Sequence, residues 1–528
     1  MKKYIYQAAL GLSIAAITLT SCEKVLDLQP LNDVTSEVVY SNAAGYKQSL
    51  AKVYGSFALT GNSGPAGSAD IVGLDEGSNG DFFRTYWQAQ ELSTDEAVIA
   101  WGDAGVQDFH NMNWTSDNPF LKGLYFKSMY QITLVNEFLR QSTDEKLSQR
   151  SISGTEADEI RKYRAEVRFL RAFQYWVLMD MFGNPPFITE NDLVGGPLPK
   201  QISRADLFAY VESELKDIET VLPTTKTADY YGRVNKFAAQ ALLARIYLNA
   251  QVYTGTARNN DAVTYSKKVI DGGYSLIPNY RHLMLNDNNV NNTESIMTIN
   301  YDGAKTQLYG GTTFLAHASV GGSMNASDYG LDGGWGGLRT TKSLVNLFPN
   351  ADGSTDKRAQ FYTNGQTLEI SSLTTFTDGY AITKYQNKNR AGAAGANATF
   401  VDADIPLFRL AEMYLIYAEA TLRGGSGNAA TALTYVNTLR ARAYGNTSGN
   451  VSSINLDVIL DERARELYWE GHRRTDLIRY DRFTTAGYLW PWKGGVKAGK
   501  SVESFKNIFP LPSADVTANP NLIQNSGY

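Results

Sequence analysis

The sequence predicts a mostly α-helical fold, in which helices form a scaffold and long irregular segments form a second, loop-rich half. Several segments repeat apolar residues at spacings of three and four and end at Gly or Pro, which is typical of amphipathic helices. Residues 60–120 and 300–402 are instead rich in Gly, Asn, Asp, Ser and Thr and have no sustained helical period. Because long irregular segments are uncommon in a compact protein unless they are functional, we expect the ligand to bind there.

The helical segments have clear ends in the sequence. The expected helix over 158–182 stops at Gly183-Asn184-Pro185-Pro186, and the one over 235–253 is followed by Gly255. Glycine readily adopts the left-handed backbone conformation in which helices often end, and proline cannot continue a helix. Further helices are expected over 124–140, 204–221, 261–270 and 456–470.

Two more helices are expected to form an antiparallel hairpin. Pro406 suits a first helical turn and is expected to open a helix that runs to Leu422. Gly424-Gly425 follows it, and Asn428 is expected to cap the next helix. A short Gly-rich connection between two helices favours an antiparallel pair. No strict repeat period is visible, so a helical-repeat scaffold is compatible with the sequence without being shown by it.

The N-terminus reads as a secretory signal. Met1-Lys2-Lys3 is followed by a mainly apolar run over 8–19 and then by Leu19-Thr20-Ser21-Cys22. An apolar run of this length is too short for a membrane span, which needs roughly 20 residues. We therefore assign residues 1–21 to a lipoprotein signal peptide.

Cys22 is the only cysteine of the 528 residues, so no disulfide can form within the chain. Leu19-Thr20-Ser21-Cys22 resembles the bacterial lipobox, in which the thiol receives a diacylglycerol and the new amino terminus is then acylated. The alternative is a stray cysteine that happens to follow a signal. Several acyl chains form a stable anchor where one would be marginal, so we expect Cys22 to be the lipidation site.

Composition excludes one class of partner and leaves another open. The net charge of -5 and the lack of a long basic run give no footprint for nucleic acid. Tyr, Phe and Trp make up 12% of the chain. Such residues serve both in cores and on surfaces that bind flat or ring-shaped ligands, and composition alone does not choose between these uses.

Several segments, taken in order, resemble the SusD/RagB family of outer-membrane nutrient-binding lipoproteins. The matching segments are 22–30 (CEKVLDLQP), 165–172 (AEVRFLRA), 181–186 (MFGNPP), 241–248 (ALLARIYL), 404–412 (DIPLFRLAE), 418–420 (AEA), 462–467 (ERAREL), 470–477 (EGHRRTDL), 510–512 (PLP) and 519–525 (NPNLIQN). Each is weak alone, but their order and their spread over the mature chain are not explained by chance. The similarity is strongest to the starch-binding founder of the family, on 75–77, 83–85, 91–96, 309–311 and 488–495.

The resemblance implies the rest of the architecture and a function. It implies tetratricopeptide-like helix pairs as the scaffold, with an N-terminal region over 22–235 and a C-terminal region over 236–528 in one intertwined unit. It implies a lipid-anchored protein at the cell surface that captures an oligosaccharide, starch or another α-glucan. The implied partners are the outer membrane and a TonB-dependent transporter of the SusC type. No cofactor is implied, and we assign no metal ligand.

Matching the family's starch-binding segments places the glycan on Arg84, Trp101, Tyr309 and Trp335. A sugar ring has an apolar C–H face and a rim of hydroxyls, so it needs flat aromatic surfaces and a few polar groups. The three aromatic residues are expected to stack on sugar rings, and Arg84 is expected to donate to hydroxyls. Considered without the resemblance each would more often be a core residue, but their Gly-rich, non-periodic surroundings favour the surface role.

The chain departs from the founder's pattern at two positions. Ile99 stands where a second tryptophan is expected, and Ala104 stands where an asparagine is expected. One polar contact is thereby lost, for which Asp103 or Gln107 is a candidate substitute. This change bears more on which glycan is bound than on whether a glycan is bound.

The most enzyme-like feature is a cluster of Glu462, Glu466, Glu470 and His472, because carboxylates four apart share a helix face. The spacing is wrong for a Glu-x-x-His metal site, and Arg463, Arg465, Arg473 and Arg474 lie beside these acids. We therefore expect structural ion pairs rather than a metal centre.

Asp95-Glu96 could form a glycosidase pair, since such enzymes place two carboxylates around the scissile bond. Adjacent residues on an extended segment point to opposite faces, so we expect that these two do not share a site. No phosphate loop, Cys/His metal pattern or nucleophile elbow is present. We expect a protein that is not an enzyme. The alternatives are a glycoside hydrolase and a peptide or glycopeptide receptor of the RagB type.

Overall fold

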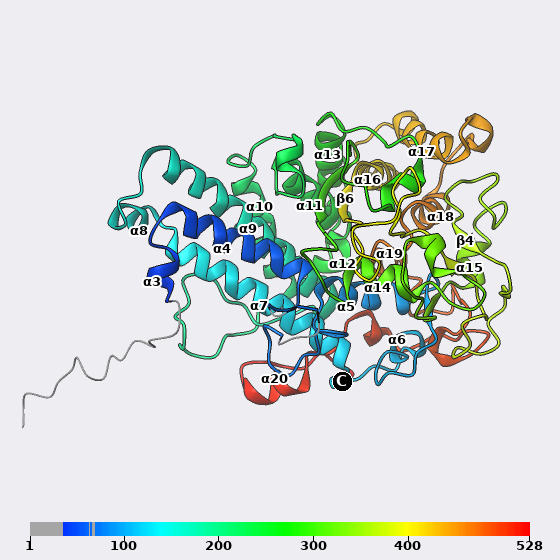
Figure 1. Ribbon diagram of the computed structural model, residues 1–528, viewed down its shortest axis with the longest axis horizontal. Coiled ribbons are helices and arrows are strands. Elements are labelled where there is room, and N and C mark those ends of the chain that lie inside the picture. The colour runs from blue at the N-terminus through cyan, green and yellow to red at the C-terminus, as the bar shows by residue number, and fades with distance from the viewer. Residues whose placement is uncertain (1–34, 63, 66–68) are drawn as a thin grey trace, which may run out of the picture.

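Long helices that pack in sequence order form one half of the molecule. The computed structural model describes residues 35–62, 64–65 and 69–528 (Figure 1). The long helices are α4 (Ala43–Ala58), α7 (Pro119–Gln141), α9 (Gly154–Phe182), α10 (Arg204–Ile218), α11 (Lys236–Leu248), α13 (Asn259–Ile270), α16 (Leu410–Leu422) and α17 (Ala429–Tyr444). In this half α7 packs on α9, α9 on α10, α10 on α11, α11 on α13, α13 on α16 and α16 on α17.

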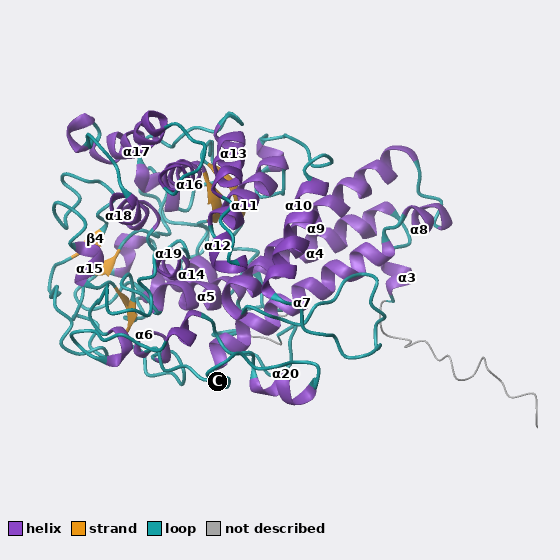
Figure 2. Cartoon of the chain, turned by 180° about the vertical axis from the view of Figure 1, so that it is seen from behind, coloured by secondary structure: helices purple, strands orange, loops and turns teal. Residues whose placement is uncertain are grey.

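Loops and shorter elements form most of the other half, where Figure 2 shows short strands among long loops, while a further strand pair lies against the helices. The other helices are α3 (Ser36–Val39) and α8 (Asp144–Gln149), which lie at the outer end of the helical half in Figure 1, and α5 (Phe82–Trp87), α6 (Asp108–Asn111), α12 (Ala250–Thr254), α14 (Gly311–Ala318), α15 (Lys342–Val345), α18 (Leu456–Leu467), α19 (Arg473–Arg479) and α20 (Ser513–Ala518). Short helical turns are η1 (Gln88–Leu92), η2 (Ala228–Tyr230), η3 (Tyr280–Met284), η4 (Ala326–Tyr329), η5 (Thr447–Gly449), η6 (Lys493–Gly495) and η7 (Ser504–Asn507). Three antiparallel pairs are β1 (Val98–Ile99) with β3 (Leu338–Arg339), β2 (Ser295–Ile299) with β6 (Ile405–Arg409), and β4 (Phe361–Tyr362) with β5 (Ala381–Ile382).

This arrangement confirms the predicted class of a helical scaffold with a loop-rich half. Helix α9 ends at Gly183, whose φ of 74° suits glycine, before the two prolines. The Asn428 side chain caps α17 by accepting from the Thr431 N–H at 2.9 Å. The expected irregular segments do contain short helices, α5, α6, α14 and α15, which are too short for their period to stand out in the sequence.

The expected start of α16 at Pro406 is wrong. Residues 405–409 form strand β6, in which Pro406 lies opposite Thr298 of β2, and the helix begins only at Leu410. Proline has no N–H to donate, and a strand with a single partner tolerates it because one of its edges forms no ladder. The all-buried run Ile405–Arg409 is typical of a strand covered on both faces.

Cys22 and the predicted signal peptide lie outside the described residues, so the structure does not address them. Among the helices from residue 35 onward, none combines the length and the apolar composition that crossing a membrane requires.

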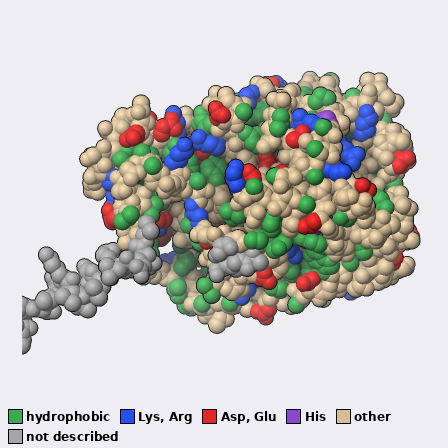
Figure 3. Space-filling view, viewed as in Figure 1, with side chains coloured by type: hydrophobic (Ala, Val, Ile, Leu, Met, Phe, Trp, Pro, Cys, Tyr) green, Lys and Arg blue, Asp and Glu red, His purple; other side chains and the backbone are tan. Residues whose placement is uncertain are grey.

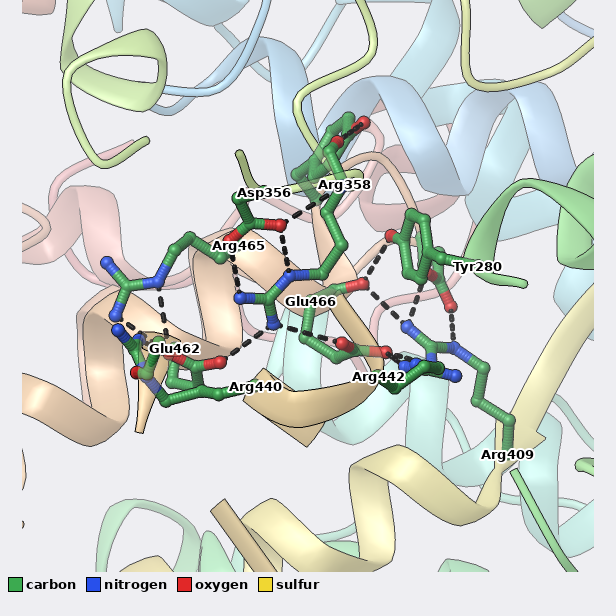
Figure 4. A network of polar contacts seen from close by, with 12 residues as sticks. Tyr280, Asp356, Arg358, Arg409, Arg440, Arg442, Glu462, Arg465 and Glu466 are labelled. Atoms are coloured by element: carbon green, nitrogen blue, oxygen red, sulfur yellow. Dashed lines mark hydrogen bonds and ion pairs between the residues drawn. The ribbon is translucent and has the colours of Figure 1, made fainter. Parts of the chain in front are cut away.

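A buried cluster of charges connects the scaffold to the loop-rich half (Figure 4). Glu466 of α18 accepts from Arg409 of β6 at 2.6 Å, from Arg358 of the loop before β4 at 3.1 Å, and from Arg442 of α17. The neighbouring Glu462 accepts from Arg358 at 2.7 Å and also from Arg440 and Arg465. All of these carboxylates are fully buried, so each charge depends on its partners.

The predicted ion pairing of Glu462, Glu466 and Glu470 is therefore confirmed, but the expected partners are largely wrong. Of the nearby arginines only Arg465 reaches these acids. Glu470 lies beyond the end of α18 and pairs with Arg409 and Lys384. The partners come from distant segments because the neighbouring arginines are engaged elsewhere in the interior, Arg463 with Asp476 and Arg473 with Asp95.

The cluster makes the stability of the fold sensitive to acid. Burial alone would raise the pKa of Glu462, but the guanidinium groups around it outweigh that effect and lower the pKa to about 2. The same balance lowers the pKa of Glu466. A lowered pKa in the folded state means that the stabilisation is present above the ordinary value of 4.5 and is lost as the pH falls toward 2.

Changing Glu466 to Gln should destabilise the fold strongly, because it removes a buried carboxylate that Arg358, Arg409 and Arg442 share and leaves excess buried positive charge. We expect a loss of about 3–5 kcal/mol in the free energy of unfolding, measured by urea denaturation at pH 7. Glu159→Gln is the matched control, since Glu159 pairs with Lys162 on the exposed face of α9 and should cost less than about 1 kcal/mol. Equal losses in the two variants would contradict the role of the cluster.

Candidate functional site

The pairing of β1 with β3 brings two of the predicted aromatic residues together. Ile99 lies opposite Leu338, and the Ala100 N–H donates to the Gly337 carbonyl at 2.8 Å. Trp101, two residues after Ile99, therefore emerges beside Trp335, three residues before Leu338. The Trp101 indole N–H donates to the Trp335 carbonyl at 3.1 Å, and the ring centroids are 6.4 Å apart.

The Gly-rich segment 333–337 is required by close packing. A Cβ on Gly337 would lie 2.5 Å from the Trp101 ring, and a Cβ on Gly334 would lie 2.4 Å from the Val320 carbonyl oxygen. The N–H groups of Trp335, Gly336 and Gly337 donate to carbonyls at the end of α14 and just beyond it, each at 2.8 Å. The segment is thus held against α14, and glycine is the residue that allows this approach.

Helix α14 places the third predicted ring. Tyr309 lies just before the helix and its ring is 6.2 Å from that of Trp335 and 5.5 Å from that of Phe400. Trp101, Tyr309 and Trp335 are each half-buried, so part of every ring faces solvent. We call these three residues the aromatic cluster. The structure brings together all three aromatic residues that the sequence analysis selected.

His317, which the sequence analysis did not select, supports Trp335 from behind. Its ring stacks on the indole with a centroid distance of 4.7 Å and an angle of 19° between planes. The two ring nitrogens of His317 lie 2.7 and 2.9 Å from the carbonyl oxygens of Gly333 and Thr399. It thereby joins the loop that carries Trp335 to the loop that carries Phe400. Its position eight residues after Tyr309, near the end of a short helix, gave no sequence signal.

Arg84 lies at the edge of the aromatic cluster but is more deeply buried than the sequence analysis implied. Only 6% of the residue is exposed, and Nη1 donates to the Gly77 carbonyl at 2.6 Å and the Tyr309 carbonyl at 3.4 Å. The guanidinium also lies over the rings of Phe314 and Trp101. Burial lowers its pKa to about 10, so it stays charged at neutral pH. Arg84 therefore holds the site together through Nη1, while its Nε, which is buried, and its Nη2 have no acceptor among the described residues.

The two departures from the expected pattern have different settings. Ile99 is fully buried within β1, so its side chain belongs to the core and presents no surface to a ligand. Ala104 is exposed next to Asp103, which is also exposed. Gln107 instead donates to the Trp101 carbonyl at 2.9 Å, which positions the loop. Asp103 is thus the freer of the two candidate substitutes.

The carboxylates of Asp95 and Glu96 face the interior rather than the aromatic cluster. Asp95 forms a paired contact with Arg473 at 2.7 Å from each oxygen, and Glu96 lies 3.6 Å from the same guanidinium. The expectation that they point apart is wrong, because the chain bends here and both reach Arg473. Their shared partner is a buried arginine, which leaves no room for a substrate between them.

Glu91 and Glu96 form a second carboxyl pair beneath the loop after α18. Glu91 accepts from the Gly471 and His472 N–H groups at 2.7 and 3.1 Å, and Glu96 accepts from the Trp469 N–H at 3.3 Å. Burial raises the pKa of Glu91 to about 7, and burial with the nearby Glu91 raises that of Glu96 well above its ordinary value. The described residues contain no group of three or more His, Cys, Asp or Glu side chains arranged to hold a metal.

A cavity of about 370 Å³ between α4, α9 and β2 lies away from the aromatic cluster. It is lined mainly by apolar side chains, including Leu50, Phe57 and Met297. It has few polar groups to meet the hydroxyl rim of a sugar. The open aromatic cluster suits a chain of several sugar rings better than this cavity does.

Glu91→Gln should change the pH dependence of stability, because Glu91 must lose its proton at high pH in a buried site. The stabilisation from its protonated form is present below the ordinary pKa of 4.5 and is lost as the pH rises through about 7. The free energy of unfolding of the variant should therefore rise relative to that of the wild type between pH 4.5 and 8. The expected difference is on the order of 3 kcal/mol, at about 1.4 kcal/mol per pKa unit. Urea denaturation across this range measures the difference. Glu145→Gln, on an exposed position of α8, should give a curve parallel to the wild type, and a parallel curve for Glu91→Gln would contradict the assignment.

Comparison with known proteins identifies relatives over the full chain. The model of the SusD family matches residues 360–528, and a model described as "Starch-binding associating with outer membrane" matches residues 70–248. The chain is 34% identical over 573 residues to the starch-binding protein SusD of Bacteroides thetaiotaomicron, and the alignment covers 100% of this chain and 99% of that protein.

Solved structures share the fold at lower sequence identity. A SusD superfamily protein from Parabacteroides distasonis has a TM-score of 0.70 at 21% identity, covering 94% of this chain and all of that one. Surface glycan-binding protein A from Bacteroides thetaiotaomicron, solved in complex with laminarihexaose, has a TM-score of 0.67 at 20% identity, covering 91% of this chain and 99% of that one.

Proposed function

The chain belongs to the SusD family, and from that premise we propose that it is a cell-surface lipoprotein that captures an oligosaccharide and delivers it to a SusC-type TonB-dependent transporter. The observation that carries the proposal is the convergence of Trp101, Tyr309 and Trp335, whose rings come from three segments of the chain and remain partly exposed. Rings that served only the core would be covered by neighbouring side chains.

The aromatic cluster meets the physical requirements of a sugar-binding surface. The planes of neighbouring rings are tilted by 45° between Trp101 and Trp335 and by 57° between Tyr309 and Trp335. Successive sugar rings can then stack on surfaces that turn relative to one another, which suits a curved glycan more than a flat one. Arg84 Nη2 and Asp103 are the nearby polar groups that we assign to hydroxyls.

We assign an α-glucan such as starch as the ligand. The tilt between the rings and the similarity to the starch-binding protein SusD support this assignment. A β-glucan is the alternative, since a related structure contains laminarihexaose. A panel of maltoheptaose and laminarihexaose distinguishes the two, and a protein that binds only the second would overturn the α-glucan assignment while leaving glycan binding intact.

We also propose that the protein has no catalytic activity of its own. A hydrolase would need two carboxylates converging on the aromatic cluster, whereas Asp95 and Glu96 are engaged with buried Arg473. Glycan turnover that survives repurification, followed as new reducing ends, would favour the hydrolase. Peptide recognition usually relies on backbone hydrogen bonds along an exposed strand, so the aromatic cluster argues against a RagB-type peptide receptor.

Tyr309→Ala is the cleanest test of the platform, because its ring is half-buried and its removal leaves the Arg84 contact with the Tyr309 carbonyl in place. Loss of one stacking contact, worth about 1–3 kcal/mol by analogy with nucleobases, should weaken maltoheptaose binding roughly tenfold or more. Calorimetric titration measures the affinity, and a thermal melt of the same sample should move little.

Tyr435→Ala provides the control for losing a half-buried ring elsewhere, since Tyr435 stacks on Tyr414 between α16 and α17. It should bind maltoheptaose like the wild type. Trp335→Ala and Trp101→Ala should also lose affinity but lower the melting temperature as well, because the Trp335 ring packs on His317 and the Trp101 ring on Gly337. A Tyr309→Ala protein that binds normally would remove this residue from the site. Arg84→Ala should lower both binding and stability, since Arg84 bonds to two carbonyls.

The membrane anchor and the transporter are tested in one set of experiments. Changing Cys22 to Ala should abolish incorporation of labelled palmitate and release the protein from the membrane fraction, because several acyl chains supply the membrane affinity. Wild-type protein extracted from the outer membrane in mild detergent should bring down a large β-barrel protein. Normal labelling of the variant would contradict the anchor, and a wild type that purifies alone would contradict the partnership.

A further inference from the structure

An exposed apolar loop protrudes from the scaffold between α9 and α10. Its base is closed by the Phe187 N–H donating to the Lys200 carbonyl at 2.9 Å, and its tip carries Leu193 and Val194, which are 81% and 80% exposed. Leu198 is also exposed. Exposed apolar side chains that lie together can form an interaction surface, whereas single ones are common on protein surfaces.

The acidic residues of this loop are held away from its tip. Glu190 pairs with buried Arg171, and the Asp192 carboxylate folds back to accept from the Thr189 N–H at 2.7 Å. The base is braced from the other side by the C-terminal segment, where Asn521 donates to the Leu198 carbonyl at 2.9 Å. The tip is therefore an apolar surface on a supported base.

The loop lies on the face from which the described chain begins. Figures 1 and 2 both show it running beside α3 and beside the start of the coloured chain. The contacts agree: Ser36 of α3 donates to Glu137 at 2.9 Å, and Arg140, which bonds to Glu137 at 3.1 Å, donates to the Asp192 carbonyl at 3.4 Å.

Exposed aliphatic residues gather on this face. The described residues include ten exposed large aliphatic side chains, and five of them lie on α3, on the loop or on the C-terminal segment that braces it. The five are Val38, Leu193, Val194, Leu198 and Ile523. Figure 3 shows hydrophobic and charged side chains interspersed over the viewed side. The described chain begins at the left of this view, at the end of the molecule that carries α3.

We propose that this loop inserts its apolar tip into the lipid surface to which the protein is tethered. The proposal rests on the lipid anchor at Cys22 that forms part of the proposed function. Cys22 lies fourteen positions before Ser36, and a chain spans at most about 3.3–3.6 Å per residue, so the bilayer lies within about 50 Å of α3. Because the described chain begins at α3, beside the loop, the tip of the loop lies within reach of the lipid surface.

The tether makes a weak contact sufficient. A linked group meets its surface at a high effective concentration, so two or three aliphatic side chains can remain inserted without binding lipid strongly on their own. Interfacial helices bury their apolar faces about 5–10 Å into the headgroup region, and the side chains at the loop tip need only a similarly shallow depth. In this arrangement the loop would fix the orientation of the globular part above the membrane.

A fluorescent label at the tip tests the contact. Val194→Cys introduces the only free thiol of the lipidated protein, since Cys22 is the only native cysteine and carries the lipid. The full-length protein, labelled with the environment-sensitive dye NBD, is reconstituted into phosphatidylethanolamine and phosphatidylglycerol vesicles. We expect blue-shifted emission and quenching by lipids that carry a nitroxide near the headgroup. Val290→Cys, at an exposed valine on the loop before β2, is the matched control and should show neither effect.

Each outcome separates the contact from the anchor. Protein that floats with the vesicles while position 194 behaves like position 290 would overturn the loop contact and leave the anchor standing. Protein that fails to float would overturn the anchor, and the contact with it. A label at 194 that is shielded only when the copurified β-barrel protein is present would assign the loop to a protein partner and overturn insertion into lipid.

Discussion

The buried charge cluster around Glu466 is the interaction on which the arrangement of the two halves depends. Its arginines come from β6, from α17 and from the loop before β4, so one carboxylate connects the helical scaffold with the loop-rich half. Burying charges is costly unless each is paired, and a partly assembled cluster would be worse than none. The halves are therefore expected to form together rather than as separate units.

The cluster is linked to the aromatic residues by a short chain of contacts. Just after α18, Trp469 accepts from the Trp87 indole N–H and donates its own indole N–H to the Glu96 carbonyl. Glu96 lies two residues before β1, whose pairing with β3 positions Trp101 next to Trp335. The aromatic cluster thus lies on a surface whose supports are tied to the most buried part of the protein. Binding by stacking needs such rigidity, because a ring that must first be ordered loses affinity.

The charged residues and the aromatic residues serve separate purposes in this fold. The carboxylates that invite an enzymatic interpretation, Asp95, Glu96, Glu462 and Glu466, are all engaged by buried arginines. Near the aromatic cluster the described residues include Arg84, Asp103 and Asp332, whose polar groups suit contacts with hydroxyl groups. Binding and release without chemistry is the behaviour that this separation supports.

The sequence by itself determined the helical scaffold, whose periods, caps and stops appear in the structure within a few residues, as at Gly183 and Asn428. It also indicated which aromatic residues to examine, since Trp101, Tyr309 and Trp335 lie in Gly-rich segments without a helical period. Only the tertiary structure decided that these rings meet, because Trp101 and Trp335 are joined by the register of a strand pair more than two hundred positions apart. It likewise decided that Pro406 lies in a strand, that Arg84 is held by backbone carbonyls, and that Glu466 pairs with Arg409 and Arg442. Such choices depend on which distant groups can satisfy a buried charge or an open hydrogen bond, and local spacing carries no information about them.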